Sequence, residues 1–179
     1  MKKFTQLPMC CVSYLNLGSL INSEIKVINF DKVKSSFSSD HKIAEPPKSV
    51  DALAFGSNGE PIFIEFKNKS KDVISKSKMD LTQKIYDSVL LYCDLFKSYP
   101  TVIRGYGTYI IVYSEDELNP RQNLIKKSQL HATNKVIHFV NSQLQGWLVL
   151  KVLELTQSEF YSYLDINILK TSKKQDGSI

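Results

Sequence analysis

The segment PIFIEFKN, residues 61–68, is the feature that most constrains the fold of this chain. Its first part is apolar at consecutive positions, which is the pattern of a strand buried on both faces rather than on one. Charge enters only near the end, at Glu65 and Lys67, which are two residues apart and therefore lie on the same face of a strand. The chain therefore needs a sheet that other elements cover on both sides.

A second short apolar run, residues 51–55, precedes this segment and is separated from it by Gly56-Ser57-Asn58-Gly59. Glycine and asparagine in this arrangement are typical of a hairpin turn. The two runs are therefore predicted to pair as antiparallel strands.

Helices and further strands are predicted on either side of this hairpin. Apolar residues between Leu15 and Ile28 recur roughly at helical spacing and predict an N-terminal helix. The same spacing returns from Leu81 to Phe96, with Asp80 as the expected N-cap and the helix ending before Pro100. The segment Thr108 to Tyr113 is apolar on both faces and predicts a central strand.

The last third of the chain continues the alternation of helices and strands. Asn119-Pro120 predicts the start of a helix, because proline is favoured at the first helical position. Trp147 to Leu155 predicts a strand, and Thr156 with Glu159 forms a capping-box pattern that predicts a final helix. These elements predict an α/β fold in which helices flank a mixed central sheet. Residues 1–169 are expected to form a single domain, and residues 170–179 a frayed, flexible tail.

Composition narrows the cellular setting and the partners. The chain has 23 lysine and arginine residues against 18 acidic ones, a mild basic excess that is compatible with nucleic acid. No uninterrupted apolar stretch approaches the length that a membrane span needs, so no membrane partner is expected. The three cysteines form no CxxC pair, which favours a reducing compartment, and a cytoplasmic location is predicted.

The hairpin carries the residues that best suit catalysis. The carboxylate of Glu65, at the rim of the sheet, can hold a divalent cation, and Asp51 can supply a second carboxylate for the same cation. Mg²⁺ takes oxygen ligands of this kind, and hydrolysis of a phosphodiester needs a cation that polarises the phosphoryl oxygens.

The turn decides whether the two carboxylates meet. A two-residue Asn58-Gly59 turn would place Asp51 opposite Phe66 and away from Glu65. A three-residue loop of Ser57, Asn58 and Gly59, with Gly59 in the left-handed region, would place Asp51 directly opposite Glu65. The sequence permits both turns.

The stretch SVDALAFGSNGEPIFIEFKN, residues 49–68, resembles the core of the PD-(D/E)XK nuclease superfamily, with Val50 where that family has proline. The resemblance implies that Asp51 and Glu65 bind Mg²⁺ or Mn²⁺ and that Lys67 orients the attacking water. It also suggests supporting positions. Glu24 would match an acid on the first helix, Glu45 would be a third ligand, and Gln83 with Tyr86 is similar to a pair on the helix that follows.

Each of these residues also has a structural explanation. The charges of the hairpin can form an ordinary cross-strand pair on the surface. Asp80-x-x-Gln83 is close to a capping box, and Glu24 and Glu45 can be solvated. The lysines that follow the hairpin can track phosphates or belong to a solvated loop, and Lys69, Lys71 and Lys76 are the ones expected to bind nucleic acid.

These observations predict a metal-dependent nuclease that hydrolyses phosphodiester bonds, with DNA favoured over RNA as the substrate. The alternative is a non-catalytic module that binds nucleic acid or protein and keeps a nuclease-like fold. A chain of 179 residues has little space for a separate sequence-reading domain. A homodimer or a protein partner is therefore expected if cleavage occurs at defined sites.

Overall fold

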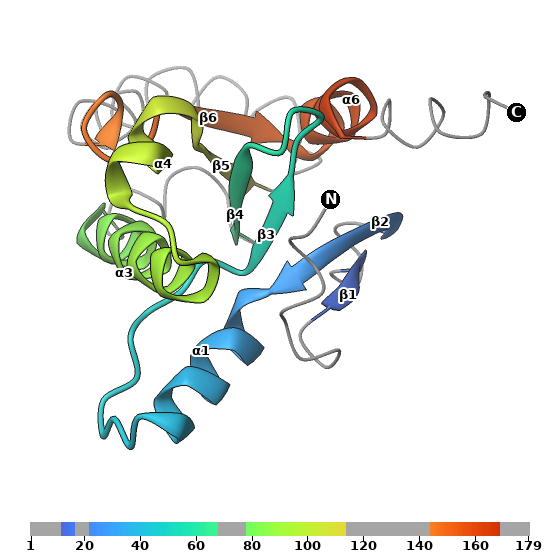
Figure 1. Cartoon of the computed structure of the whole chain (residues 1–179). Helices are drawn as coiled ribbons and strands as arrows, with labels where there is room; N and C mark the ends of the chain where they lie inside the picture. Colours follow the sequence, from blue (N-terminus) through green and yellow to red (C-terminus); the bar gives the residue numbers. More distant parts are fainter. Residues whose placement is uncertain (1–11, 17–21, 68–77, 114–143, 169–179) are drawn as a thin grey trace, which may run out of the picture.

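The computed structural model describes residues 12–16, 22–67, 78–113 and 144–168 of the chain (Figure 1). Side chains are described from residue 25 onward within these ranges, except at Lys78. Within them, six strands form one sheet in the order of the sequence. The strands are β1 (Val12–Asn16), β2 (Asn22–Asn29), β3 (Ala52–Phe55), β4 (Pro61–Lys67), β5 (Thr108–Tyr113) and β6 (Lys151–Thr156).

The sheet is mixed, as the sequence predicts. Strands β1 to β4 pair antiparallel, whereas β4, β5 and β6 run parallel. Parallel neighbours need crossovers that cover the sheet, which explains why β4 and β5 are apolar on both faces. The described helices are α1 (Phe30–Asp40), α3 (Lys78–Phe96), α4 (Pro100–Tyr106) and α6 (Gln157–Asn167).

Two hydrophobic cores lie on opposite faces of the sheet. One core joins Phe63 of β4 and Tyr109 of β5 to residues of α1, α3 and α4. The other joins Ile62 and Ile64 of β4 to Phe160 and Leu164 of α6. The molecule is therefore a three-layer α/β/α arrangement, with α6 on the side of the sheet away from α3 (Figure 1).

The β3–β4 hairpin adopts the register of the three-residue loop. Ala52 pairs with Ile64 and Phe55 with Pro61. The amide of Gly56 donates to the carbonyl of Glu60 at 2.9 Å, and the amide of Gly59 donates to the carbonyl of Gly56 at 2.9 Å. Gly59 has a φ of 77°, in the left-handed region that glycine adopts without strain. Of the two turns that the sequence permits, the longer one forms.

The predicted N-terminal helix is wrong. Residues within 15–28 belong to β1 and β2, which pair antiparallel. The apolar residues of β2 alternate, because Ile25 and Val27 lie in the core beneath α6 whereas Ile28 lies in the opposite core. The first helix instead begins at Phe30, where the side chain of Asn29 accepts a hydrogen bond from the amide of Lys32. Over so short a stretch, apolar residues at a strand period of two also fit a helical spacing.

The helix predicted at 81–96 is confirmed as α3, but it begins at Lys78, so Asp80 lies in its first turn and is not the cap. Pro100 follows the end of that helix as predicted and also starts α4, which the sequence pattern did not indicate. The strand at Thr108 to Tyr113 is confirmed as β5.

The strand predicted from Trp147 begins only at Lys151, because residues 144–149 form a turn with Gly146 at a φ of 75°. The capping box of Thr156 and Glu159 is confirmed at the start of α6. The helix predicted at Asn119-Pro120 and the tail at 170–179 lie outside the described residues. Among the described helices, none combines the length and apolar character that crossing a membrane requires.

Candidate active site

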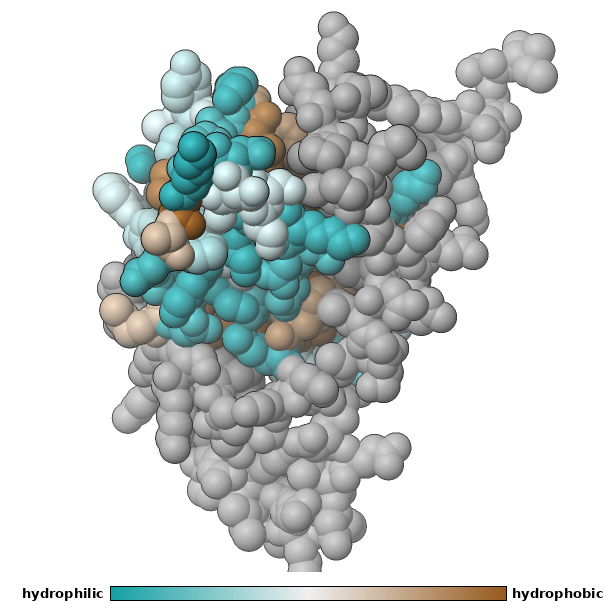
Figure 2. Space-filling model, turned by 90° about the horizontal axis from the view of Figure 1, so that it is seen from below, coloured by the Kyte–Doolittle hydropathy of each residue, from teal (hydrophilic) through white to brown (hydrophobic). Residues whose placement is uncertain are grey.

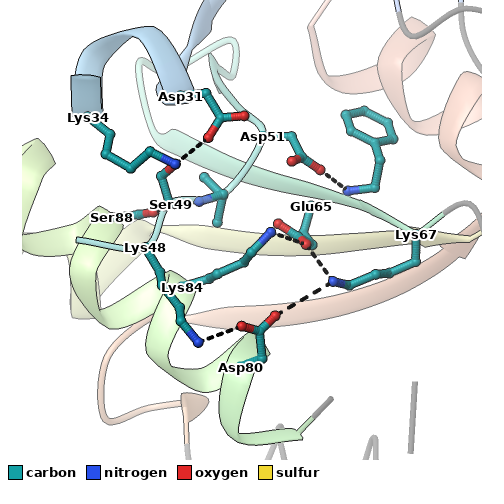
Figure 3. Close-up of polar contacts among 12 residues, drawn as sticks. Asp31, Lys34, Lys48, Ser49, Asp51, Glu65, Lys67, Asp80, Lys84 and Ser88 are labelled. Carbon is teal, nitrogen blue, oxygen red and sulfur yellow. Dashed lines mark hydrogen bonds and ion pairs between the residues drawn. The ribbon is translucent and has the colours of Figure 1, made fainter. Parts of the chain in front are cut away.

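The candidate site lies where β4 ends, on the face of the sheet that α3 covers (Figure 3). Glu65 follows Phe63 on that face, and its side chain is only 1% exposed. Its Oε1 atom lies 2.8 Å from Nζ of Lys67 and 2.7 Å from Nζ of Lys84, which comes from α3. A buried carboxylate oxygen is thus held between two ammonium groups from different elements.

Asp51 joins this cluster from the other arm of the β3–β4 hairpin. It directly precedes β3, and continuing the hairpin register by one residue from the Ala52–Ile64 pair places it opposite Glu65. Its Oδ2 accepts a hydrogen bond of 2.6 Å from the amide of Phe66, and its carbonyl accepts one of 3.2 Å from the amide of Phe30. The hairpin and the start of α1 therefore both hold Asp51 in place.

Both carboxyl groups have raised pKa values, chiefly because they are buried. Burial raises the pKa of Glu65 above its ordinary value, and the charge of Asp51 raises it further, although Lys67 and Lys84 oppose this rise. Burial also raises the pKa of Asp51, against the amide of Phe66 and the charge of Lys84. Acids with raised pKa values hold protons more firmly than exposed ones, because their negative charge is incompletely compensated.

Lys84 responds in the opposite way to the same surroundings. Burial acts to lower its pKa, but the hydrogen bond to Glu65 and the neighbouring negative charges outweigh burial, so the pKa of Lys84 lies above its ordinary value. The ammonium form of Lys84 is thus stabilised by Glu65. Lys84 therefore places positive charge against a buried carboxylate, as a bound cation would.

One oxygen of Glu65 has no such compensation. Oε2 is buried and has no hydrogen-bond partner among the described residues, and the same is true of the hydroxyl of Tyr109 on β5. An unpaired buried carboxylate oxygen costs free energy unless a donor or a cation satisfies it. With the second carboxylate at Asp51, this oxygen fits the donor set of Mg²⁺ or Mn²⁺. Within the described residues, however, no three His, Cys, Asp or Glu side chains gather as a metal-binding group.

Lys67 has a second acid nearby in addition to Glu65. Asp80, in the first turn of α3, lies 4.0 Å from Nζ of Lys67 and 2.8 Å from Nζ of Lys48 (Figure 3). The hydrogen bond from Lys48 holds the pKa of Asp80 below its ordinary value. Asp80 and Glu65 together therefore flank the ammonium group of Lys67 and limit where it can lie.

Lys84 and Asp80 are site residues that the sequence analysis did not identify. Asp80, Lys84 and Ser88 follow one another at intervals of four, so they form a polar stripe along α3. Ser88 is fully buried, and its hydroxyl oxygen accepts a hydrogen bond of 2.9 Å from the amide of Val50, next to Asp51. The helical spacing of these three polar residues along one side of α3 was the signal for this face.

Asp31 is a further acid near the site that the sequence analysis did not identify. It lies in the first turn of α1, and its Oδ1 accepts hydrogen bonds from Lys34 at 2.7 Å and Ser49 at 3.0 Å. Burial acts to raise the pKa of Asp31, but these donors outweigh burial and the pKa lies below its ordinary value. The charge of Asp31 contributes to the raised pKa of Asp51. Among the described residues, α1 thus brings an acid, Asp31, near Asp51.

The supporting residues suggested by the resemblance lie elsewhere. Glu24 is part of β2 and not of a helix, and Glu45 is exposed in the loop between α1 and β3. Gln83 is exposed on α3, beside Lys84, which is the residue that contacts Glu65. Lys69, Lys71 and Lys76 lie outside the described residues.

The surface on the side of α1 is mainly hydrophilic among the described residues, with small hydrophobic areas (Figure 2).

Comparison of the chain with protein-family models, with curated proteins and with solved structures finds no match. Function must therefore be inferred from the site itself.

Proposed function

We propose that this chain is a metal-dependent nuclease of the PD-(D/E)XK type that hydrolyses phosphodiester bonds, with DNA favoured over RNA as the substrate. The single observation that carries the proposal is the hairpin register, which brings Asp51 opposite Glu65 with Lys67 on the same face. The resemblance of residues 49–68 to that superfamily agrees with the arrangement.

In this proposal Asp51 and Glu65 hold Mg²⁺ or Mn²⁺. Both carboxylates are largely buried and carry raised pKa values, so a cation would supply the compensation that they lack. When bound, such an ion polarises a phosphoryl oxygen and lowers the pKa of a bound water.

Lys67 is proposed to orient the attacking water and to stabilise developing negative charge. Its ammonium group lies 2.8 Å from Glu65 and is bounded on the other side by Asp80, so it is held beside the carboxylates without being fully buried. Preorganised positive charge of this kind contributes more than a mobile surface lysine, because little reorganisation is needed during reaction.

A specific observation also supports a second candidate, a non-catalytic binding module. Oε1 of Glu65 is already paired with two ammonium groups, and two carboxylates plus two lysines can form a closed ion-pair cluster. In that case Lys67 and Lys84 would neutralise Glu65 permanently, and the cluster would serve only to hold α3 against the hairpin.

Cleavage assays with defined variants separate the two candidates. Asp51→Ala and Glu65→Ala should each abolish cleavage of labelled DNA in the presence of Mg²⁺ or Mn²⁺, because each removes a carboxylate that holds the cation. Lys67→Ala should lose activity by about 10² to 10³ while still binding the cation. Asp94→Ala is the matched control, since Asp94 is a solvent-exposed acid on the same helix as Lys84 and pairs only locally with Lys97.

Single- and double-stranded DNA and RNA should be compared, with EDTA as the metal-free reference and circular dichroism to verify that each variant folds. Cleavage that survives in folded Glu65→Ala protein would reject the proposal. Wild-type protein that cleaves none of the four substrates, with either cation, would favour the binding module.

A further inference from the structure

A second surface with a distinct composition lies at the other end of β5. It consists of α4 with its flanking residues, 99–107, and the turn at 144–150 before β6. Three aromatic side chains are exposed there, Tyr99 at 72%, Tyr106 at 37% and Trp147 at 58%. We call this set, together with Arg104, the aromatic surface.

Hydrogen bonds join the two segments of the aromatic surface. The amide of Leu150 donates to the carbonyl of Gly107 at 2.8 Å, and Nε of Arg104 donates to the carbonyl of Trp147 at 2.6 Å. Within the turn, the amide of Leu148 donates to the carbonyl of Leu144 at 2.8 Å. Trp147 is therefore held on an ordered turn.

Trp147 is also held by the side chain of Arg104. The guanidinium carbon lies 4.8 Å from the centroid of the indole ring, within the range of a cation–π contact. Exposing a large aromatic ring costs solvation free energy, and fixing it beside an arginine adds an entropic cost. A more typical position for a tryptophan would be the core or its boundary.

The charge of the two segments has one sign. Residues 99–107 and 144–150 contain no aspartate or glutamate and include Arg104, and Lys151 follows directly as the first residue of β6. Aromatic rings that offer a stacking face next to positive charge suit a single-stranded nucleic acid, whose bases are open to stacking and whose phosphates are anionic. A base-paired duplex does not offer its base faces in this way.

The aromatic surface is separate from the candidate active site. Gly107 directly precedes β5 at Thr108, which pairs with Ile62 at the start of β4. Glu65 and Lys67 pair with Ile111 and Tyr113, toward the other end of β5. Binding at the aromatic surface can therefore be measured without any change at the carboxylates.

We propose that the aromatic surface binds single-stranded nucleic acid, with a base stacked on Trp147 and the backbone phosphates contacted by Arg104. The site would take DNA or RNA of little sequence preference, because every base presents a face for stacking. This binding requires no divalent cation, so the proposal stands or fails independently of the proposed nuclease activity.

Intrinsic fluorescence tests the proposal directly, because Trp147 is the only tryptophan of the chain. Titration of the full chain in EDTA with short single-stranded oligonucleotides should quench its emission. Polyphosphate and an abasic oligonucleotide of equal length carry the charge without bases and should quench much less. Equal quenching by the abasic strand, or none by any oligonucleotide, would overturn the proposal.

Affinity measured by anisotropy of a labelled oligonucleotide gives the second readout. Trp147→Ala should weaken binding about five- to one-hundred-fold, Trp147→Phe should retain most of the affinity, and Arg104→Gln should weaken binding and reduce its salt dependence. Leu90→Ala is the control, since Leu90 is an exposed apolar residue on α3. If Trp147→Ala binds as tightly as wild type, the surface is not a stacking site, and its tryptophan, tyrosines and arginine would then fit a protein partner instead. DNA and RNA oligonucleotides are compared in the same assay.

Discussion

β4 presents apolar side chains to α6 along its whole length, whereas its other face changes from apolar to charged before the strand ends. Ile62 and Ile64 are fully buried beneath α6, and Phe66 packs edge-on against Phe160 there. On the α3 side, Phe63 is followed by Glu65 and Lys67. Both faces are covered by a helix, so burial alone does not explain the charges.

The two faces of β4 differ in what their buried side chains contribute to stability. A buried ion pair seldom stabilises a protein more than apolar residues of similar size would. The α3 side nevertheless keeps two carboxylates with raised pKa values and an unpaired oxygen at Glu65. A face that serves only for packing would gain from apolar side chains at these positions.

The largest expected effect comes from placing a carboxylate on the apolar face. Ile64→Glu would bury a charge in the core that contains Phe160, whose described residues include no ammonium group, and should lower the free energy of unfolding by more than about 3 kcal/mol. Ile64→Val is the matched control, with an expected loss of about 0.5–1.5 kcal/mol. Urea denaturation followed by circular dichroism measures both. A stability of Ile64→Glu close to that of wild type would show that the two faces tolerate charge equally.

A smaller effect is expected from removing the charge on the other face. Glu65 has a folded-state pKa above its ordinary value of 4.5, so the wild type loses stability as pH rises from that value through the folded pKa. The free energy of unfolding of Glu65→Gln relative to wild type should therefore increase from about pH 4.5 toward neutrality. The increase should be about 1.4 kcal/mol for each pH unit that separates the pKa values of the folded and unfolded chains.

The matching control is Asp80→Asn, which should show the opposite trend. The pKa of Asp80 lies below its ordinary value of 3.8, so its contribution to stability is present above that pH and is lost as pH falls through the folded pKa. Denaturation curves across acidic and neutral pH compare the two variants. Parallel trends in both would contradict the distinction between the inner carboxylate and the outer one.

Much of the fold could be predicted because strands that are buried on both faces have an unambiguous pattern. β4 and β5 were recognisable from continuous apolar runs, and α3 from helical spacing. β2 was not recognisable from the sequence. Ile25 and Val27 lie on one face of this strand and Ile28 on the other, and over so short a stretch these positions also fit a helical spacing. α4 is only seven residues long, and the proline at its start also marks the end of α3 in the sequence pattern, which conceals the second helix.

The candidate site was predictable where sequence neighbours create it and unpredictable where tertiary contacts do. Glu65 and Lys67 share a strand face by their spacing, and the choice between two turns decided the position of Asp51. Asp31 reaches the cluster from a helix whose rotation about its axis no local pattern specifies, and the pairing of Lys84 with Glu65 depends on a tertiary contact between α3 and β4. The stripe of polar residues on α3 was the one sequence feature that indicated the partner face.

Calorimetric titration of Mn²⁺ into the wild type and Glu65→Ala, with Asp94→Ala as the control, tests the central claim most directly. Asp51 and Glu65 should give a single binding transition in the wild type and in Asp94→Ala, and none in folded Glu65→Ala protein. At acidic pH, where carboxyl groups with raised pKa values still hold protons, binding would displace those protons, so the observed heat there should also depend on the ionisation enthalpy of the buffer. A wild type that binds no Mn²⁺, or a Glu65→Ala variant that binds it equally well, would contradict the account.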